Sequence, residues 1–233
     1  MEIVWPAIDD ELIALQERLA TLEPPPFAPS GSVMSIGACV VCFPRNTVGP
    51  GAAGDRAWAA AALATNHRVH ETAVVTGSAG ASYRPGLLAR REGPVLEAAV
   101  RALSELPEVI LVNATGRDHP RRAGLALHLG ALLDIPTVAV THRTLLAEGE
   151  LPPDERGATS PLTINGEEVG CWLRTRAGSR PLAVGPGWRT DADSATRVVM
   201  AALKRARTPE PLRRARRAAR RARAGLGEWG PSP

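Results

Sequence analysis

Polar side chains that could do chemistry gather in the segment Ile110–Leu129, which reads ILVNATGRDHPRRAGLALHL. A short apolar run is followed by Asn113, by a glycine-containing turn and by the polar residues 117–122. Side chains at the C-terminal end of a strand commonly form ligand and catalytic sites in α/β folds. A metal-dependent hydrolase would need a carboxylate at this strand end, because magnesium prefers charged oxygen ligands. The segment therefore predicts a functional cleft, although the residue at the strand end is a neutral amide.

A second group of chemically active residues lies near the C-terminus, in the run LRRARRAARRARA (212–224). On a helix, Arg213, Arg216, Arg217 and Arg220 would share one side. Such a strip would attract a phosphate backbone in a salt-dependent way. However, Lys204 is the only lysine among the 28 basic residues, which indicates a genomic preference for arginine codons. The run is therefore interpreted either as a nucleic-acid-binding patch or as a solvated helix face.

The cysteines do not suggest a redox or metal centre. Cys39 and Cys42 form a C-x-x-C pattern, but they lie within the apolar run 36–43. Residues three apart on a strand point to opposite faces, so their side chains should not meet. We expect both to be small buried side chains.

The bulk composition is typical of a globular protein. The 233 residues are 44% hydrophobic and 22% charged, with a net charge of +4. This length allows one large domain with a well-buried core. No apolar run reaches the roughly 18 residues of a spanning helix, and residues 1–19 lack the basic start of a secretory signal. We therefore expect a cytoplasmic protein without a membrane partner.

The elements that must position these residues can be predicted from periodicity and turn signals. Helices are expected at residues 8–23, 86–106, 121–133, 191–206 and 209–223. Strands are expected at residues 32–43, 56–65, 67–76, 109–113, 136–141, 162–166, 168–175 and 181–185. The alanine-rich run 57–64 could equally be helical. Three early strands followed by helix–strand alternation predict an α/β fold, with a mixed sheet flanked by helices.

The chain is expected to divide into three units. Residues 1–29 would form an N-terminal helix and Pro-rich linker, and residues 30–208 the main domain. Residues 209–233 would form the Arg-rich C-terminal helix and a Gly/Pro tail.

With these elements in place, the chain resembles the endonuclease V family over residues 33–213, about three quarters of its length. Several anchors occur in one order: IGACVVCF (36–43), SYRPGLLARREGP (82–94), residues 111–140, RPLAVGPGWR (180–189), DSA (193–195) and PEP (209–211). The resemblance implies a ribonuclease H-like fold. It also implies metal-dependent cleavage of nucleic acid near a deaminated base such as hypoxanthine.

The resemblance further implies which residues should form the site. Three expected polar positions are kept, namely Tyr83, Glu92 and His119. Four are replaced: the first-strand aspartate by Val40, the second aspartate by Asn113, a lysine by His142 and a late histidine by Trp188. One carboxylate cannot offset the mutual repulsion of two divalent ions. We therefore expect no metal at Val40 and Asn113, with magnesium or manganese bound only if a residue such as Asp118 rescues the site.

Substrate-handling positions are better preserved. Tyr83, Pro85 and Gly86 match a turn that, in the family, wedges between strands beside the lesion, and a tyrosine ring can stack on a base. Gly116 and Arg121 fall where the family forms its base pocket and contacts phosphate. Asn113 and Trp188 would also line this pocket. Alternatively, Tyr83 is an exposed turn residue and His119 a capping or core-edge histidine.

These observations lead to competing functional hypotheses. The favoured one is an endonuclease V-like protein that has lost its usual magnesium-dependent activity but still binds single-stranded or damaged nucleic acid. An alternative is a repurposed enzyme acting on a small molecule, with Glu92, His119 and His142 as acid–base groups or, together with Cys39, as ligands of a softer metal such as zinc. Further alternatives are an active endonuclease V and a non-catalytic scaffold.

Overall fold

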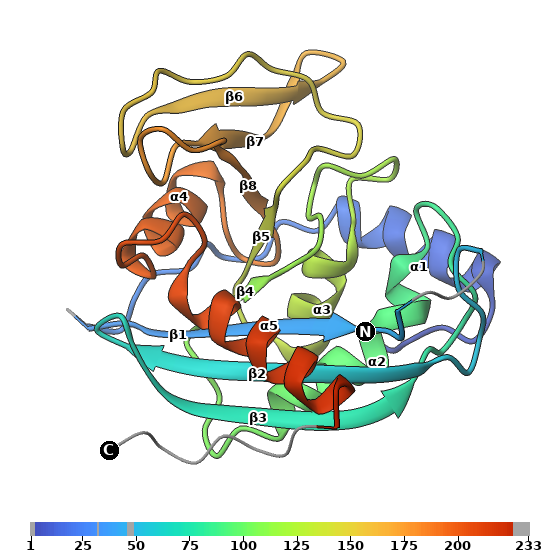
Figure 1. Cartoon of the computed structure of the whole chain (residues 1–233). Helices are drawn as coiled ribbons and strands as arrows, with labels where there is room; N and C mark the ends of the chain where they lie inside the picture. Colours follow the sequence, from blue (N-terminus) through green and yellow to red (C-terminus); the bar gives the residue numbers. More distant parts are fainter. Residues whose placement is uncertain (1–2, 32, 46–48, 226–233) are drawn as a thin grey trace.

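An eight-stranded mixed sheet forms the centre of the fold (Figure 1). The computed structural model describes residues 3–31, 33–45 and 49–225. The strand order is β3-β2-β1-β4-β5-β8-β7-β6. The strands are β1 (Ser35–Cys42), β2 (Arg56–Thr65), β3 (Arg68–Ser78), β4 (Val109–Val112), β5 (Thr137–Thr141), β6 (Thr159–Ile164), β7 (Glu167–Leu173) and β8 (Leu182–Pro186). The helices are α1 (Asp9–Ala20), α2 (Leu88–Arg101), α3 (Leu125–Leu133), α4 (Ala192–Ala201) and α5 (Glu210–Arg223). The predicted α/β class with a mixed sheet is confirmed.

The three central strands are parallel to one another, and their register sets the position of the cleft. Cys39 of β1 lies opposite Val112 of β4, and Val112 lies opposite Ala139 of β5. The carboxyl ends of β1, β4 and β5 therefore meet at one edge. Val40 and Asn113 are the next residues along their strands, so the register places them side by side at this edge.

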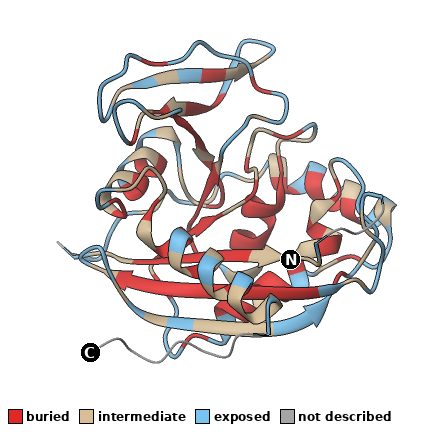
Figure 2. Cartoon of the chain, viewed as in Figure 1, coloured by how far each residue is buried: buried red, intermediate tan, exposed pale blue. Residues whose placement is uncertain are grey.

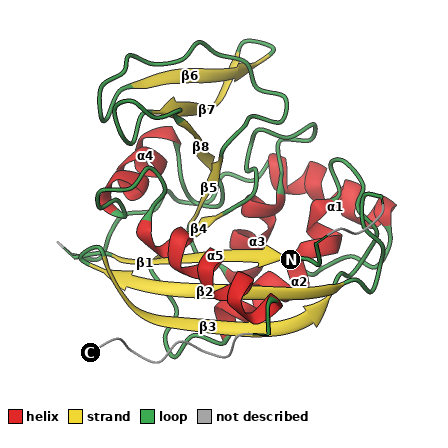
Figure 3. Ribbon diagram, viewed as in Figure 1, coloured by secondary structure: helices red, strands yellow, loops and turns green. Residues whose placement is uncertain are grey.

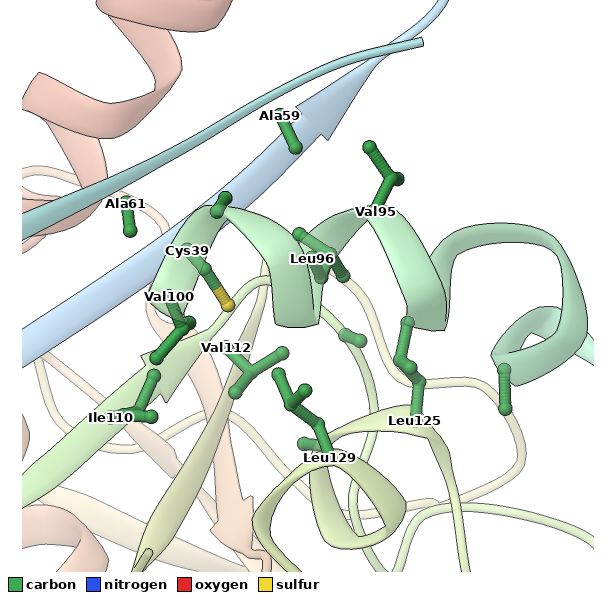
Figure 4. Packing of buried hydrophobic residues seen from close by; sticks show 14 of the residues in the cluster. Cys39, Ala59, Ala61, Val95, Leu96, Val100, Ile110, Val112, Leu125 and Leu129 are labelled. Atoms are coloured by element: carbon green, nitrogen blue, oxygen red, sulfur yellow. The ribbon is translucent and has the colours of Figure 1, made fainter. Parts of the chain in front are cut away.

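Helices cover both faces of the sheet. Buried residues of α2 and α3 pack with one face of the strands, where Leu96, Val112 and Leu129 form part of the core (Figure 4). The opposite face is covered by α4 and α5, and α5 lies across β1, β2 and β3 (Figure 3). Leu212 and Ala215 of α5 are buried against the strands, whereas the outward side of the helix is exposed (Figure 2).

The alanine-rich run forms β2 rather than a helix. Ala59 and Ala61 face the α2 side, whereas Ala60 and Ala62 face the α5 side. Burial on both faces explains why this strand lacks the polar alternation of a half-exposed strand.

Several predicted elements are shorter in the structure. The helix predicted at 121–133 begins only at Leu125, because residues 116–124 form a hydrogen-bonded turn in which Gly124 N–H donates to Gly116 O. The helices predicted at 86–106 and 191–206 are α2 and α4, which end at Arg101 and Ala201. The predicted cap of α4 is confirmed, since Asp191 accepts from Ser194 N–H.

The predicted separation of the cysteines is also confirmed. Cys39 points into the core between the sheet and α2 (Figure 4), and Cys42 packs against the cluster on the other face. All three cysteines are free thiols.

The N-terminal helix packs on the body of the fold. Leu15 and Leu19 of α1 lie in one buried cluster with Leu127 of α3, and the Trp5 indole N–H donates to Glu97 of α2. The predicted Gly/Pro tail at 224–233 lies mostly outside the described residues. Within the described ranges, no helix has the length and apolar character needed to cross a membrane.

Candidate functional site

The centre of the candidate site is a contact between the end of β4 and helix α5. Arg216 Nη2 donates to Asn113 Oδ1 at 2.6 Å, and Arg216 Nη1 lies 3.5 Å from Nε2 of His142, which follows β5. The amide of Asn113 is fixed by a second bond, because its Nδ2 donates to Val140 O at 3.2 Å. Asn113 and His142, which were predicted for the cleft, therefore lie together with Arg216, which was predicted for the surface patch.

The electrostatic character of this contact is positive. Burial, followed by the charges of Arg207 and Arg216, lowers the pKa of His142 and favours its neutral form. Burial, followed by the charge of Arg220, lowers the pKa of Arg216, but a guanidinium remains protonated at neutral pH. Asn113 and His142 thus contact a cation without neutralising it.

Val40 forms an apolar wall beside this contact. Its side chain is buried and packs with the cluster beneath α5. A branched hydrocarbon offers no lone pair to a metal ion. The position predicted to have lost a ligand therefore faces the core.

Glu92 lies in α2, close enough to Cys39 of β1 to act on it electrostatically. Its charge acts on the buried Cys39 thiol, whose pKa is raised to about 12 by burial and then by Glu92. Desolvation raises the pKa of Glu92 from 4.5 to about 7, and the nearby Arg91 guanidinium lowers it in part. A substantial fraction of Glu92 is therefore protonated at neutral pH.

Asp118 is committed to the protein backbone. Its carboxylate accepts N–H groups of residues 145–147 at 2.6, 2.8 and 2.9 Å. These bonds join the polar turn to the loop after β5, which also carries His142. Asp118 therefore holds a loop in place and does not offer free oxygens to a magnesium ion.

The tyrosine turn is held by three side chains that converge on one carbonyl. Gly86 O accepts from Arg121 Nη2 at 2.8 Å, from His119 Nε2 at 3.1 Å and from Gln16 Nε2 at 3.2 Å. Gly86 has φ +75°, a conformation that favours glycine. Pro85 and Tyr83 precede it, and Tyr83 is 42% exposed. The turn is thus anchored at its base and open at its tip.

His119 makes this anchor with both ring nitrogens. Nδ1 accepts the Arg121 backbone N–H at 3.2 Å, while Nε2 donates to Gly86 O. The ring is buried, and desolvation lowers its pKa to about 4. The structure therefore places His119 beneath the turn, bonded to protein groups on both sides.

Gly116 and Trp188 occupy positions where chain segments pack closely. A side chain at Gly116 would meet the Pro186 carbonyl at 2.0 Å, so this glycine permits close chain packing. The Trp188 backbone bonds to Thr137 at the start of β5, whereas His142 follows the end of that strand. The extended residues between them span about 16 Å. The structure does not bring Trp188 to the cleft.

The remaining predicted patch residues lie on the outward side of α5. Arg213, Arg217 and Arg220 are exposed, and Arg213 pairs with Glu210 at 2.7 Å. Arg216 is only half exposed, because it lies beside the buried Ala215 and turns toward the sheet. The four arginines therefore do not form one equivalent row.

Sequence reasoning missed some residues that shape the site. Gln16, which contacts the tyrosine turn, lies in a helix assigned to a separate N-terminal unit. Its burial among Leu12, Leu15 and Leu19 is consistent with their helical spacing, which was the one signal available. Arg207 acts on His142 from the segment before α5, and no local pattern indicated that.

Known proteins share this architecture. The family model for endonuclease V matches residues 41–217. An endonuclease V from Streptomyces avermitilis is 37% identical over 220 residues, which cover 94% of this chain and 93% of the relative. An endonuclease V from Methanopyrus kandleri is 42% identical over 148 residues, so the match spans 63% of each chain.

Solved structures agree with the sequence matches. The crystal structure of the S. avermitilis endonuclease V has a TM-score of 0.83 at 33% identity, covering 97% of this chain and 99% of that one. A Ciona intestinalis endonuclease V in complex with a 24mer DNA containing an inosine followed by a ribo-adenosine has a TM-score of 0.77. At 18% identity over 94% of this chain and 98% of that one, this likeness shows the shared fold alone.

The sheet order, its flanking helices and these structural neighbours define a ribonuclease H-like protein, which confirms the predicted fold. Because the matching family model covers most of the chain, the protein belongs to the endonuclease V family. The predicted resemblance is therefore confirmed.

Proposed function

We propose that this protein binds single-stranded or deaminated nucleic acid and does not hydrolyse it through a pair of divalent ions. The observation that carries this proposal is the bond from Arg216 to Asn113 at the strand end where the resemblance predicts an aspartate. The residue that stands where a metal ligand would be required therefore binds a cation of the protein itself.

The binding half of the proposal is supported by the surfaces around the cleft. Tyr83 lies at the open tip of an anchored turn, and its ring could stack on a base. Exposed Arg213, Arg217 and Arg220 add positive charge along α5. A structural neighbour from Ciona intestinalis is described in complex with inosine-containing DNA, which makes such an oligonucleotide a suitable first ligand.

The metal half of the proposal is supported by the chemistry of the available side chains. When bound, a pair of magnesium or manganese ions would activate water and stabilise the leaving oxygen. Val40 is apolar, and the oxygen of Asn113 already accepts from a cation. Glu92 would be the one carboxylate to hold both ions. This donor set does not fit a pair of divalent ions.

An active endonuclease V is the second candidate. It is favoured by the names of relatives such as those from S. avermitilis and M. kandleri, and by the retained Glu92. By contrast, the small-molecule alternative requires Glu92, His119 and His142 to act together, whereas both ring nitrogens of His119 are bonded to backbone groups.

A cleavage assay separates the two candidates. The purified full chain and the S. avermitilis relative are incubated with an inosine-containing single strand in magnesium or manganese. We expect nicking by the relative alone, and retention of the strand by this protein in a binding assay with chelator present. Metal-dependent nicking that disappears in Glu92→Gln would overturn the proposal and establish the active enzyme.

A further inference from the structure

We propose that Arg216, Asn113 and His142 form a metal-independent binding site for a phosphate oxyanion. In this site the guanidinium supplies the positive charge that a divalent ion would otherwise bring. The inference rests on the proposed function for its biological ligand, a phosphodiester of the nucleic-acid backbone, but the site itself can be tested separately.

The first argument is the missing counter-ion. Arg216 is half-buried, and within the described ranges it forms no ion pair with a carboxylate. Its side chain contacts the Asn113 amide and the imidazole of His142, which are both neutral groups. A partly desolvated cation held by neutral groups retains its full attraction for an anion.

The second argument is the unused hydrogen-bonding capacity of the guanidinium. It has five N–H donors, of which one is directed to Asn113 Oδ1 and one toward His142. The remaining donors form part of a planar fork that matches two oxygens of a phosphate. His142 is exposed, so the site opens to solvent.

The third argument concerns why an amide suits this position. Asn113 orients the guanidinium through a 2.6 Å bond, and its own position is fixed by Val140 O. A carboxylate there would orient Arg216 equally well but would cancel its charge. The amide therefore keeps the arginine both positioned and available.

Surrounding charges favour the same class of ligand. Arg220 and Arg207 act on the two ends of this contact, since their charges lower the pKa values of Arg216 and His142. The local field is therefore positive at neutral pH, which draws anions rather than cations.

The test uses the full chain with three probes in the presence of EDTA. Inorganic phosphate and the dinucleotide of thymidine, which has a single phosphodiester, are titrated while the side-chain Nδ2–H signal of Asn113, which every variant keeps, is followed by NMR. A labelled decathymidylate is titrated by fluorescence anisotropy. The variants are Arg216→Gln, Arg216→Lys and, as the matched control, Arg213→Gln, which removes one exposed charge from the same helix.

We expect Arg216→Gln to weaken dinucleotide and decathymidylate binding about ten-fold or more, the usual loss for a charge-assisted bond. Arg213→Gln should change both affinities by less than about two-fold, and Arg216→Lys should keep part of the affinity for each probe. Thermal unfolding shows whether each variant is folded. If Arg216→Gln does not fold, the affinities of Arg216→Lys and Arg213→Gln are compared instead, and a larger loss in Arg216→Lys supports the site.

Failures of the site and of the proposed function are distinguishable. Equal losses in Arg216→Gln and Arg213→Gln, or loss of binding on adding EDTA, would overturn the site. Decathymidylate binding that is unchanged in Arg216→Gln also overturns the site while the proposed function stands. If inorganic phosphate binds through Arg216 but neither the thymidine probes nor the inosine-containing strand does, the site stands for free phosphate and the proposed function is wrong.

Discussion

Arg216 and Asn113 are 103 positions apart in the chain, yet their side chains meet at 2.6 Å. The bond joins the last helix to the end of a central strand. At this strand end, where we predicted the loss of a metal ligand, the bond places the positive charge of a guanidinium. The consequences can be tested by changing either residue or the groups that surround them.

Replacing Asn113 by Asp should create an ion pair with Arg216 rather than a metal site. The new carboxylate would have a lowered folded-state pKa, so the gain in stability is present above its unfolded pKa of about 3.9 and is lost as the pH falls through the folded value. We expect about 1 kcal/mol of added stability at pH 7 by chemical denaturation. Dinucleotide binding should weaken at the same time. Binding that strengthens on adding magnesium to this variant would contradict the prediction.

Replacing Glu92 by Gln should stabilise the fold in a pH-dependent way. The pKa of Glu92 is raised from 4.5 to about 7, so its protonated form is favoured in the folded state. Below about pH 4.5, Glu92 is protonated in both states and does not destabilise the fold relative to Gln. As the pH rises toward 7, the unfolded chain releases this proton more readily and the wild-type protein loses stability. The variant should therefore be more stable by on the order of 2 kcal/mol at pH 8 and little changed at pH 4. If the free energy of unfolding changes with pH in the same way for the wild type and for Glu92→Gln, Glu92 is not desolvated.

Replacing His119 by Gln should reduce the acid sensitivity of the fold. Burial lowers the pKa of His119 to about 4, so the unfolded chain binds this proton more readily than the folded chain. Stability is complete above about pH 6.5 and falls as the pH drops toward 4, by at most about 1.4 kcal/mol per pH unit. The variant should be less stable at pH 7, because it leaves a cavity, but should lose stability less steeply. Urea unfolding between pH 4 and 7 measures both effects.

Replacing Tyr83 by Ala should weaken nucleic-acid binding without unfolding the protein. Tyr83 is 42% exposed, so loss of its ring should change the free energy of unfolding by less than about 0.5 kcal/mol. If the ring stacks on a base, affinity for decathymidylate should fall by about 1–3 kcal/mol. Tyr83→Phe is the matched control and should keep most of the affinity. Equal affinities of the Ala and Phe variants would show that the ring makes no stacking contact.

The fold could be predicted well because its signals are local and repeated. Apolar runs and turn residues gave the order of the strands along the chain, and the anchors at 36–43 and 111–140 gave the family. The beginning of α3 could not be predicted, since the turn before it depends on a bond between Gly124 and Gly116 and on the close approach of Pro186. Such contacts leave no periodic pattern.

The site was harder to predict than the fold because its key contacts join distant segments. Aligning motifs placed Asn113 and His142 at the cleft, but helical spacing alone assigned Arg216 to a surface strip. Its turn toward the sheet follows from burial of Ala215 and Ala219 against β1 and β2. Which arginines of α5 turn toward the sheet and which toward solvent is therefore determined by packing rather than by the charge pattern.

The contacts of the Gly86 carbonyl have a consequence for the order in which segments of the chain must dock. This carbonyl accepts bonds from Gln16 in α1 and from Arg121 in the turn after β4, and Arg121 Nε also donates to Gln16 at 2.7 Å. The tyrosine turn is therefore fully held only after both the first helix and the middle of the chain have docked. In a Gln16→Ala variant, the turn that carries Tyr83 would lose one of its three side-chain contacts at Gly86 and would keep those from Arg121 and His119. Damage to the first helix would therefore loosen a turn that lies far from it in the sequence.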